Sequence, residues 1–396
     1  MLNQTDSSAF PRPPAARRVL KNIVESAILM VGLGYGLAQS PPWQRPEPGW
    51  LYIVDGDSLR GDKTSRVLVV DPDRDVVVEQ LPVTGYQVAL AQSHDGRRLY
   101  VVSGPAGVGM LTIIDTTTSQ ITGRVSVPNR VLVTTLPDSA TLAISRDDRW
   151  VFVENMKTTV PGVDEYSVSI IDAQNPNRPI HIAPIPSCGV GHLMTESRAW
   201  DLLIHCFATN AVRMIGVGPD GAVTRTDSEA LPSRPKTDAA KVAAPVATRS
   251  ATIALEDSRG QISAMMGDGQ GVDGAPDVLH LNLDVFASPV FIPMQNWAVT
   301  KDGHLLYGGV TPLANAAQHE GKLNQVAVID LDTRKQTATI PIPYPFFSLA
   351  LSASGDALFA ASPRSGKVVV IDTAQQRINR VLSNVGASPI KVLVSP

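Results

Sequence analysis

The sequence predicts an all-β chain, and two observations lead to this prediction. The first is that helical periodicity is nearly missing after residue 40, and the second is a repeated strand motif. The motif is an apolar, β-branched run that ends on Asp, followed by a polar turn and another β run. It occurs at 66–81, 110–125, 167–182, 325–340 and 367–382, with a degenerate copy at 211–226. Each copy is typical of two adjacent strands joined by a turn.

A second motif, in which an Asp/Gly turn joins two apolar strands, precedes most copies of the first. It occurs at 88–102, 140–154, 296–310 and 349–362. Together the two motifs give four antiparallel strands in roughly 45 residues, which is typical of one blade of a β-propeller. Allowing one irregular copy around 261–283, we expect seven blades. A pair of β-sandwiches is the alternative, and the regular repeat argues against it.

The two ends of the repeat region predict a closed ring. Residues 49–56 supply only a second strand to the first blade, whereas residues 387–396 supply an inner strand with no blade of its own. Pairing the C-terminal strand into the first blade would complete that blade and remove the exposed edges of an open ring. We therefore expect one propeller domain over 49–396.

The N-terminus is a different kind of sequence. Residues 1–26 contain four basic and two acidic side chains, and the apolar run 27–38 follows them. A basic region before a short apolar run that ends in small residues is typical of a secretory signal. A membrane span would need roughly 20 apolar residues. We expect residues 1–38 to be a signal peptide, or else an uncleaved anchor that is the protein's only membrane contact. Residues 39–48 then form a Pro-rich linker, and the protein is periplasmic.

Composition and motifs exclude several classes of function. The formal net charge is −3 and the charged residues are scattered, so the chain lacks the basic stripe that nucleic-acid binding needs. The sequence contains no G-x-S-x-G, H-E-x-x-H or C-x-x-C-H motif. The segments 71–75 and 268–277 have carboxylates spaced somewhat as in calcium loops, but ordinary hairpin turns explain these Asp and Gly residues better.

Loop lengths indicate which face of the ring binds. The turns between first and second strands are short and alike, whereas the connections between second and third strands, at 54–65, 154–166 and 308–323, are longer and vary. Insertions that collect on one face usually mark the binding side. We therefore predict that the partner-binding or substrate-entrance face contains Asp55, Asp57, Arg60, Glu154, Lys157, Trp297 and His319.

Cys188 and Cys206 are the chain's two cysteines, and His192 and His205 lie near them. These four side chains carry the donor atoms of a zinc site. However, His205 and Cys206 are consecutive in an apolar strand, so their side chains point to opposite faces. Two cysteines of an exported protein tend to pair, and these two lie near the ends of one hairpin. We predict a disulfide, with a zinc site and a free reactive thiol as the alternatives.

The stretch PIPSCGVGHLM…DLLIHCFATNAVRMIGVGPDG resembles the heavy subunit of methylamine dehydrogenase, a family of periplasmic seven-bladed propellers with a comparably spaced cysteine pair in the middle blade. The resemblance covers residues 49–396. The motifs SRVLVVDPDRDVVVEQLP and NQVAVIDLDTRKQTATIPI support it, although propellers of the YVTN type share them. The stretch 231–283 aligns poorly, and FIPMQNWAVT lacks the glycine pair expected there.

The resemblance implies a heterotetramer that oxidatively deaminates primary aliphatic amines. It implies a quinone cofactor built from two tryptophans of a separate small light subunit, with a copper protein or a cytochrome as electron acceptor. The heavy subunit would frame the active-site entrance and hold the light subunit, without catalytic residues, cofactor or metal of its own. Two alternatives are a periplasmic binding or scaffold propeller without amine chemistry, and an independent enzyme such as a lactonase-like hydrolase.

Overall fold

The chain divides into two units, 1–44 and 45–396, and all residues described below belong to the second unit. The predictions for 1–38 and 39–48 lie outside the described residues. No helix within the described part of the chain is long and apolar enough to cross a membrane. The computed structural model describes residues 49–56, 65–85, 89–104, 109–128, 130–131, 141–160, 163–189, 191–195, 200–206, 209, 211–230, 251–256, 262–266, 277–281, 297–310, 324–333 and 335–395.

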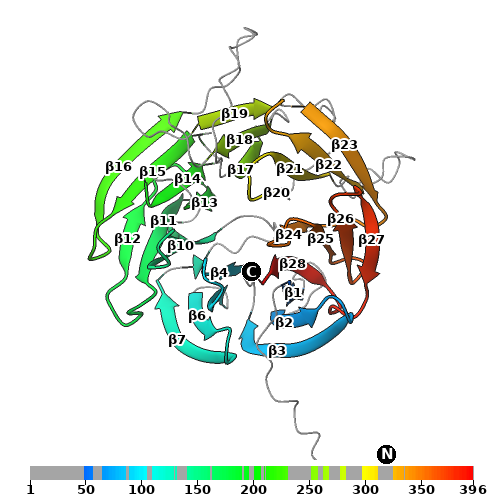
Figure 1. Cartoon of the computed structure of the whole chain (residues 1–396). Helices are drawn as coiled ribbons and strands as arrows, with labels where there is room; N and C mark the ends of the chain where they lie inside the picture. The colour runs from blue at the N-terminus through cyan, green and yellow to red at the C-terminus, as the bar shows by residue number, and fades with distance from the viewer. Residues whose placement is uncertain are drawn as a thin grey trace, which may run out of the picture. The chain divides into compact units, whose positions relative to one another are not determined.

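These residues form 28 β-strands, arranged in seven antiparallel sheets (Figure 1). Contacts join successive sheets, for example β4 with β9, β10 with β13 and β24 with β28. The prediction of an all-β propeller built from four-stranded antiparallel blades is therefore confirmed. Five of the sheets have four strands, and the sheet of β17–β19 has three among the described residues.

The strands fall into blades as follows. The seam blade contains β1 (Leu51–Asp55), β2 (Ser65–Asp71), β3 (Val76–Gly85) and β28 (Pro389–Val394), and the next contains β4 (Ala89–Gln92), β5 (Arg98–Ser103), β6 (Gly109–Asp115) and β7 (Gln120–Val127). The arm blade contains β8 (Arg130–Val131), β9 (Leu142–Ile144), β10 (Trp150–Val160), β11 (Val163–Asp172) and β12 (His181–Pro184). The disulfide blade contains β13 (Gly191–Met194), β14 (Leu202–Cys206), β15 (Ala211–Val217) and β16 (Val223–Ala230).

Three further blades complete the described strands. They contain β17 (Ala251–Glu256), β18 (Ile262–Met266) and β19 (Asp277–Leu281); β20 (Trp297–Val299), β21 (Leu305–Val310), β22 (Asn324–Asp330) and β23 (Lys335–Ile342); and β24 (Ser348–Leu351), β25 (Ala357–Ser362), β26 (Lys367–Asp372) and β27 (Arg377–Leu382).

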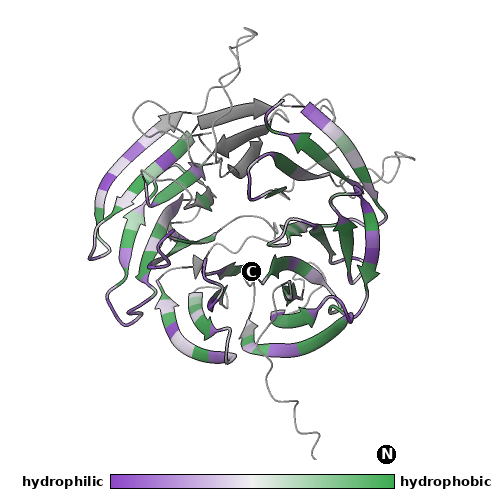
Figure 2. Cartoon of the chain, viewed as in Figure 1, coloured by the Kyte–Doolittle hydropathy of each residue, from purple (hydrophilic) through white to green (hydrophobic). Residues whose placement is uncertain are grey.

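The core lies between neighbouring blades. Residues of β5, β6 and β10 form one buried apolar cluster, and residues of β10, β11 and β14 form the next. The outer strands are more polar: in β7 and β23 exposed residues alternate with half-buried ones, and Figure 2 shows hydrophilic colours along outer strands such as β16. Because each blade buries one sheet face against each neighbour, the β-branched second and third strands supply most of the core.

The Asp that follows the apolar run in the first motif closes the turn between the two strands. Asp71 Oδ1 accepts hydrogen bonds from the backbone N–H of Asp73 (2.9 Å) and of Arg74 (3.2 Å). Asp115 and Asp172 accept the same two bonds, and Asp330 and Asp372 accept the bond from the backbone N–H three residues ahead. A side-chain oxygen that accepts from the backbone two or three residues ahead stabilises a tight turn. The repeated Asp therefore has a structural reason, and the hairpin-turn interpretation of 71–75 is confirmed.

The C-terminal strand closes the ring, as predicted. β28 pairs with β1 in an antiparallel register that runs from Leu51 opposite Val394 to Asp55 opposite Pro389. The backbone N–H of Ser395 donates to the carbonyl of Trp50 at 2.7 Å, which extends the ladder by one bond. The first and last strands of the domain therefore share one sheet, in which β1 lies between β28 and β2 (Figure 1).

Candidate functional site

We define the long-connection face as the face at which the second strand of each blade ends and the third begins. Asp55 is the last residue of β1, Glu154 and Lys157 lie on β10, and Trp297 is the first residue of β20. These four residues belong to three blades, so the structure places them around one face without joining them into one site. Asp57, Arg60, His319 and the side chain of Trp297 lie outside what the structure describes.

The hairpin of β10 and β11 continues beyond its blade. Their pairing runs from Trp150 opposite Asp172 to Val160 opposite Val163, whereas β5–β6, β21–β22 and β25–β26 each pair over six residues. A long connection was expected at 154–166, whereas most of these residues pair as one continuous ladder. Six residue pairs of an antiparallel ladder bring the hairpin to about Asn155, and the remainder extends about 17 Å further. We call residues 155–167 the arm.

Additional strand pairing supports the base of the arm. Arg130 and Val131 of β8 pair with Met156 and Asn155, so the first residues of the arm have a neighbour on each side. Further along, Lys157 lies opposite Glu165, and both side chains are exposed. Opposite charges directly across a ladder stabilise it by roughly 0.2–1 kcal/mol. The arm is thus a defined structural element with a polar, charged outer part.

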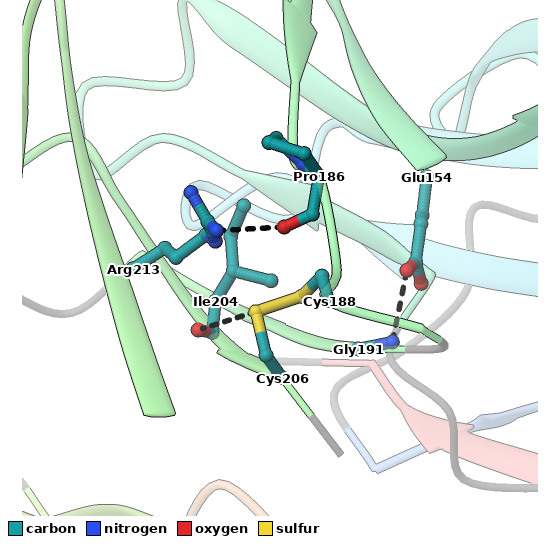
Figure 3. The surroundings of a disulfide bond; sticks show 7 residues. All are labelled: Glu154, Pro186, Cys188, Gly191, Ile204, Cys206 and Arg213. Carbon is teal, nitrogen blue, oxygen red and sulfur yellow. Dashed lines mark hydrogen bonds between the residues drawn. A yellow bond between two sulfur atoms is a disulfide. The ribbon is translucent and has the colours of Figure 1, made fainter. Parts of the chain in front are cut away.

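Glu154 lies where the arm leaves the blade and is fully buried, with a relative exposure of 0%. Its Oε1 accepts a hydrogen bond of 2.8 Å from the backbone N–H of Gly191, the first residue of β13 (Figure 3). Its Oε2 has no hydrogen-bond partner among the residues that the structure describes. Desolvation raises the pKa of Glu154 to about 8, although the bond from Gly191 acts in the opposite direction. The carboxyl is therefore mainly neutral at pH 7.

The surroundings of Glu154 explain this desolvation. Alternation along β10 places Glu154 on the same side as Trp150 and Phe152, both of which belong to the buried cluster between the arm blade and the disulfide blade. Ile204 and the two cysteines belong to the same cluster. A buried carboxylate in apolar surroundings costs several kcal/mol unless it is paired or takes up a proton. The apolar surroundings of Glu154 therefore favour the protonated, neutral form of its carboxyl.

Cys188 and Cys206 form a disulfide, as predicted, with their Cα atoms 4.4 Å apart and both side chains fully buried. Cys206 is the last residue of β14. Cys188, however, does not open β13: it precedes that strand by three residues, in the connection from the arm blade. The disulfide therefore joins an inter-blade connection to the long-connection face. Both cysteine sulfurs are committed to this bond, so the zinc and free-thiol alternatives are excluded.

Two more contacts hold this connection in place. The guanidinium of Arg213 donates to the carbonyl of Pro186 at 2.6 Å (Figure 3). The backbone N–H of Cys188 donates to the carbonyl of Ile185 at 3.3 Å. Ser187 and Gly189, on either side of the cysteine, have positive φ angles of 60° and 67°. The disulfide, the arginine and the Glu154–Gly191 bond thus meet where the arm blade joins the disulfide blade.

Comparison of the blades shows that Glu154 departs from the repeat. It is the fourth residue after Trp150, which pairs with the turn residue Asp172. Counting in the same way from the partners of Asp115, Asp330 and Asp372 gives Val102, Gly309 and Ala361. A buried carboxyl is therefore not needed to build a blade. Alignment of the repeats would have shown this signal in the sequence.

Asp55 is committed to the ring seam. Its side chain is 5% exposed and forms an ion pair of 2.8 Å with Arg66. It also accepts a hydrogen bond of 2.7 Å from the backbone N–H of Ser388, just before β28. Asp55 therefore fixes the connection that leads into the closing strand. Its place on a partner-binding face stays a prediction.

No family model matches the sequence, and no curated protein matches it. A functionally unknown protein from Desulfotomaculum acetoxidans DSM 771 is similar in structure, with a TM-score of 0.59, 13% identity, and coverage of 87% of this chain and 98% of the other. The fold is a β-propeller.

Two further structures share this propeller fold. The periplasmic gluconolactonase PpgL of Pseudomonas aeruginosa has a TM-score of 0.57 and 16% identity, over 88% of this chain and 99% of that protein. The dihydro-heme d1 dehydrogenase NirN has a TM-score of 0.51 and 15% identity, over 87% of this chain and 66% of NirN. Identities this low show the fold alone. The similarities do not show the amine dehydrogenase family that the sequence resembles.

Proposed function

We propose that this protein is a non-catalytic β-propeller subunit of the periplasm that holds a protein partner on its long-connection face. The observation that carries this proposal is the arm, which extends about 17 Å past the blade that supports it. The blade does not need this length, because other blades complete their ladders with six residue pairs. An ordered hairpin that projects from one face gives a partner a preformed surface, which lowers the entropic cost of binding.

The chemistry of the arm suits a protein partner. Lys157, Asp164 and Glu165 are exposed on it, and Tyr166 is half-buried near its base. Interfaces between proteins combine a polar, solvent-accessible rim with aromatic side chains nearer the centre. The charged side chains along the arm and the aromatic side chain near its base correspond to this arrangement.

We further propose that the partner is the quinone-bearing light subunit of an amine dehydrogenase that deaminates primary aliphatic amines. Two features support this more specific proposal: the sequence resemblance, and the buried disulfide that the resembling stretch contains. The tryptophan-derived quinone would belong to the light subunit, and a copper protein or a cytochrome would accept the electrons. In this proposal the present chain frames the entrance and holds no cofactor.

Purification of the native protein under non-denaturing conditions tests both levels of the proposal. We expect a small chain to co-elute with it, detected by intact mass, and a quinone absorbance that a primary aliphatic amine bleaches. Co-elution of a chain without quinone would retain the partner-holding role and refute the amine chemistry. Elution of this protein alone, with hydrolysis of gluconolactone by the isolated chain, would refute the proposed function.

A shortened arm tests whether the arm makes the contact. Replacing residues 158–164 by Asn-Gly joins Lys157 to Glu165 through a two-residue hairpin turn and leaves the blade intact. We expect the shortened protein to keep its melting temperature and to lose the partner. A matched pair of point variants refines the test: Lys157→Ala on the arm should weaken binding, and Lys301→Ala, at an exposed turn on the opposite face, should not.

A further inference from the structure

The arm has an ionisable group at its base. Glu154 is the residue of β10 next to the arm, it is fully buried, and it bonds to the first residue of the neighbouring blade. At the corresponding position three other blades have Val102, Gly309 and Ala361, none of which ionises, and the disulfide blade has His205. Among these five described blades, the one with a carboxyl at this position is the blade to which the arm is attached.

Among the side chains that the structure describes, no cation bonds to Glu154; Arg130 of β8, which pairs with Met156, has a side chain outside the described residues. On β11, burial and the charges of Asp164 and Glu154 raise the pKa of Tyr166. Thr141, whose carbonyl accepts from the N–H of Glu154, does not titrate. On the disulfide blade the cysteines do not titrate, Arg213 bonds to a backbone carbonyl instead, and alternation turns His205 toward the opposite sheet face.

We propose that Glu154 is a pH-sensitive latch: its neutral carboxyl keeps the base of the arm packed against the disulfide blade, and its ionisation loosens this junction and frees the arm. The physical reason is solvation. A charged carboxylate in this apolar cluster lacks the water it would have outside, so opening the junction is the way to hydrate it. The consequence for partner binding rests on the proposed function, whereas the opening of the junction does not.

Hydrogen exchange of the isolated full-length protein tests the latch without a partner. The peptides to follow cover 150–168 and 185–206, and each rate is corrected for the intrinsic pH dependence of exchange. If the closed junction has a carboxyl pKa of about 8 and the open one has the ordinary value of 4.5, the opening constant should rise about 50-fold from pH 6 to pH 8 and level off above that. A rise of less than threefold would overturn the proposal.

Variants separate Glu154 from other titrating groups. Glu154→Gln should make the opening constant independent of pH over this range. Glu154→Val should do the same, and valine is the residue that the β4–β7 blade has at the corresponding position, Val102. Glu79→Gln is the matched control, because burial also raises the pKa of Glu79, a carboxyl of the seam blade; this variant should keep the wild-type rise. The same rise in either Glu154 variant would refute the latch. Loss of partner co-elution would leave these exchange results unchanged, so the two proposals fail separately.

Discussion

Replacement of Glu154 by glutamine should change how the stability of the whole protein depends on pH. The side chain keeps its size, and its carbonyl oxygen can still accept from the N–H of Gly191. In the wild type, the folded-state pKa of about 8 lies above the ordinary value of 4.5. The folded chain therefore binds more protons than the unfolded chain between these values, and stability falls as the pH rises through this range.

The size of the effect follows from the two pKa values. Well between them, each pH unit changes the free energy of unfolding by about 1.4 kcal/mol, so the wild type loses about 3 kcal/mol between pH 4.5 and 7 and about 4 kcal/mol by pH 8. The glutamine variant does not lose this energy. Urea denaturation of both proteins at pH 5, 6, 7 and 8 measures the difference in their free energies of unfolding. Such fits are precise to roughly 0.5 kcal/mol. If the difference between the two proteins stays constant within that value from pH 5 to pH 8, Glu154 does not hold a proton in the folded protein as proposed.

Three further variants test the contacts around the site and the seam. Replacing Cys188 and Cys206 by alanine, which removes a cross-link between residues 18 apart, should lower the free energy of unfolding by about 3 kcal/mol in urea; a loss below about 1 kcal/mol would contradict the staple role. Gly191→Ala places a Cβ 2.9 Å from Ile204 Cγ2, so it should cost about 1–3 kcal/mol in the same assay, and an unchanged midpoint would show that the contact relaxes freely. Asp55→Asn removes the charge that pairs with Arg66 and should cost about 2 kcal/mol, measured by thermal unfolding, whereas a variant as stable as the wild type would argue against a role in the seam.

The fold was predictable because its signals are local and repeated. Each strand pair depends on β-branched residues and on a turn that one Asp closes with its own backbone neighbours, such as Asp71 with Asp73 and Arg74. The closing strand was also predictable, because Pro389–Val394 read as a strand without a blade. The disulfide followed from the number of cysteines and from alternation in β14.

The site was predictable only in part. Glu154 was expected on the binding face as part of a connection, because the run from Glu154 to Tyr166 contains the polar residues and the Pro-Gly pair of a loop. The long pairing of β10 with β11 depends on backbone bonds, which composition does not reveal. The burial of Glu154 depends on Gly191, 37 residues later, and a contact at that distance leaves no local pattern.

The pairing of β1 with β28 means that the first blade cannot finish folding until the end of the chain has been synthesised. During synthesis β1 is made near the start of the domain, but its partner strand Pro389–Val394 emerges from the ribosome only at the end. Until then one edge of β1 offers unpaired backbone groups to any other strand, as edge strands do. Long-range pairing of this kind closes slowly. A chain released before Pro389 would therefore expose the unpaired edge of β1 in its first blade. Pairing of this edge with a strand of another molecule is the expected route to aggregation.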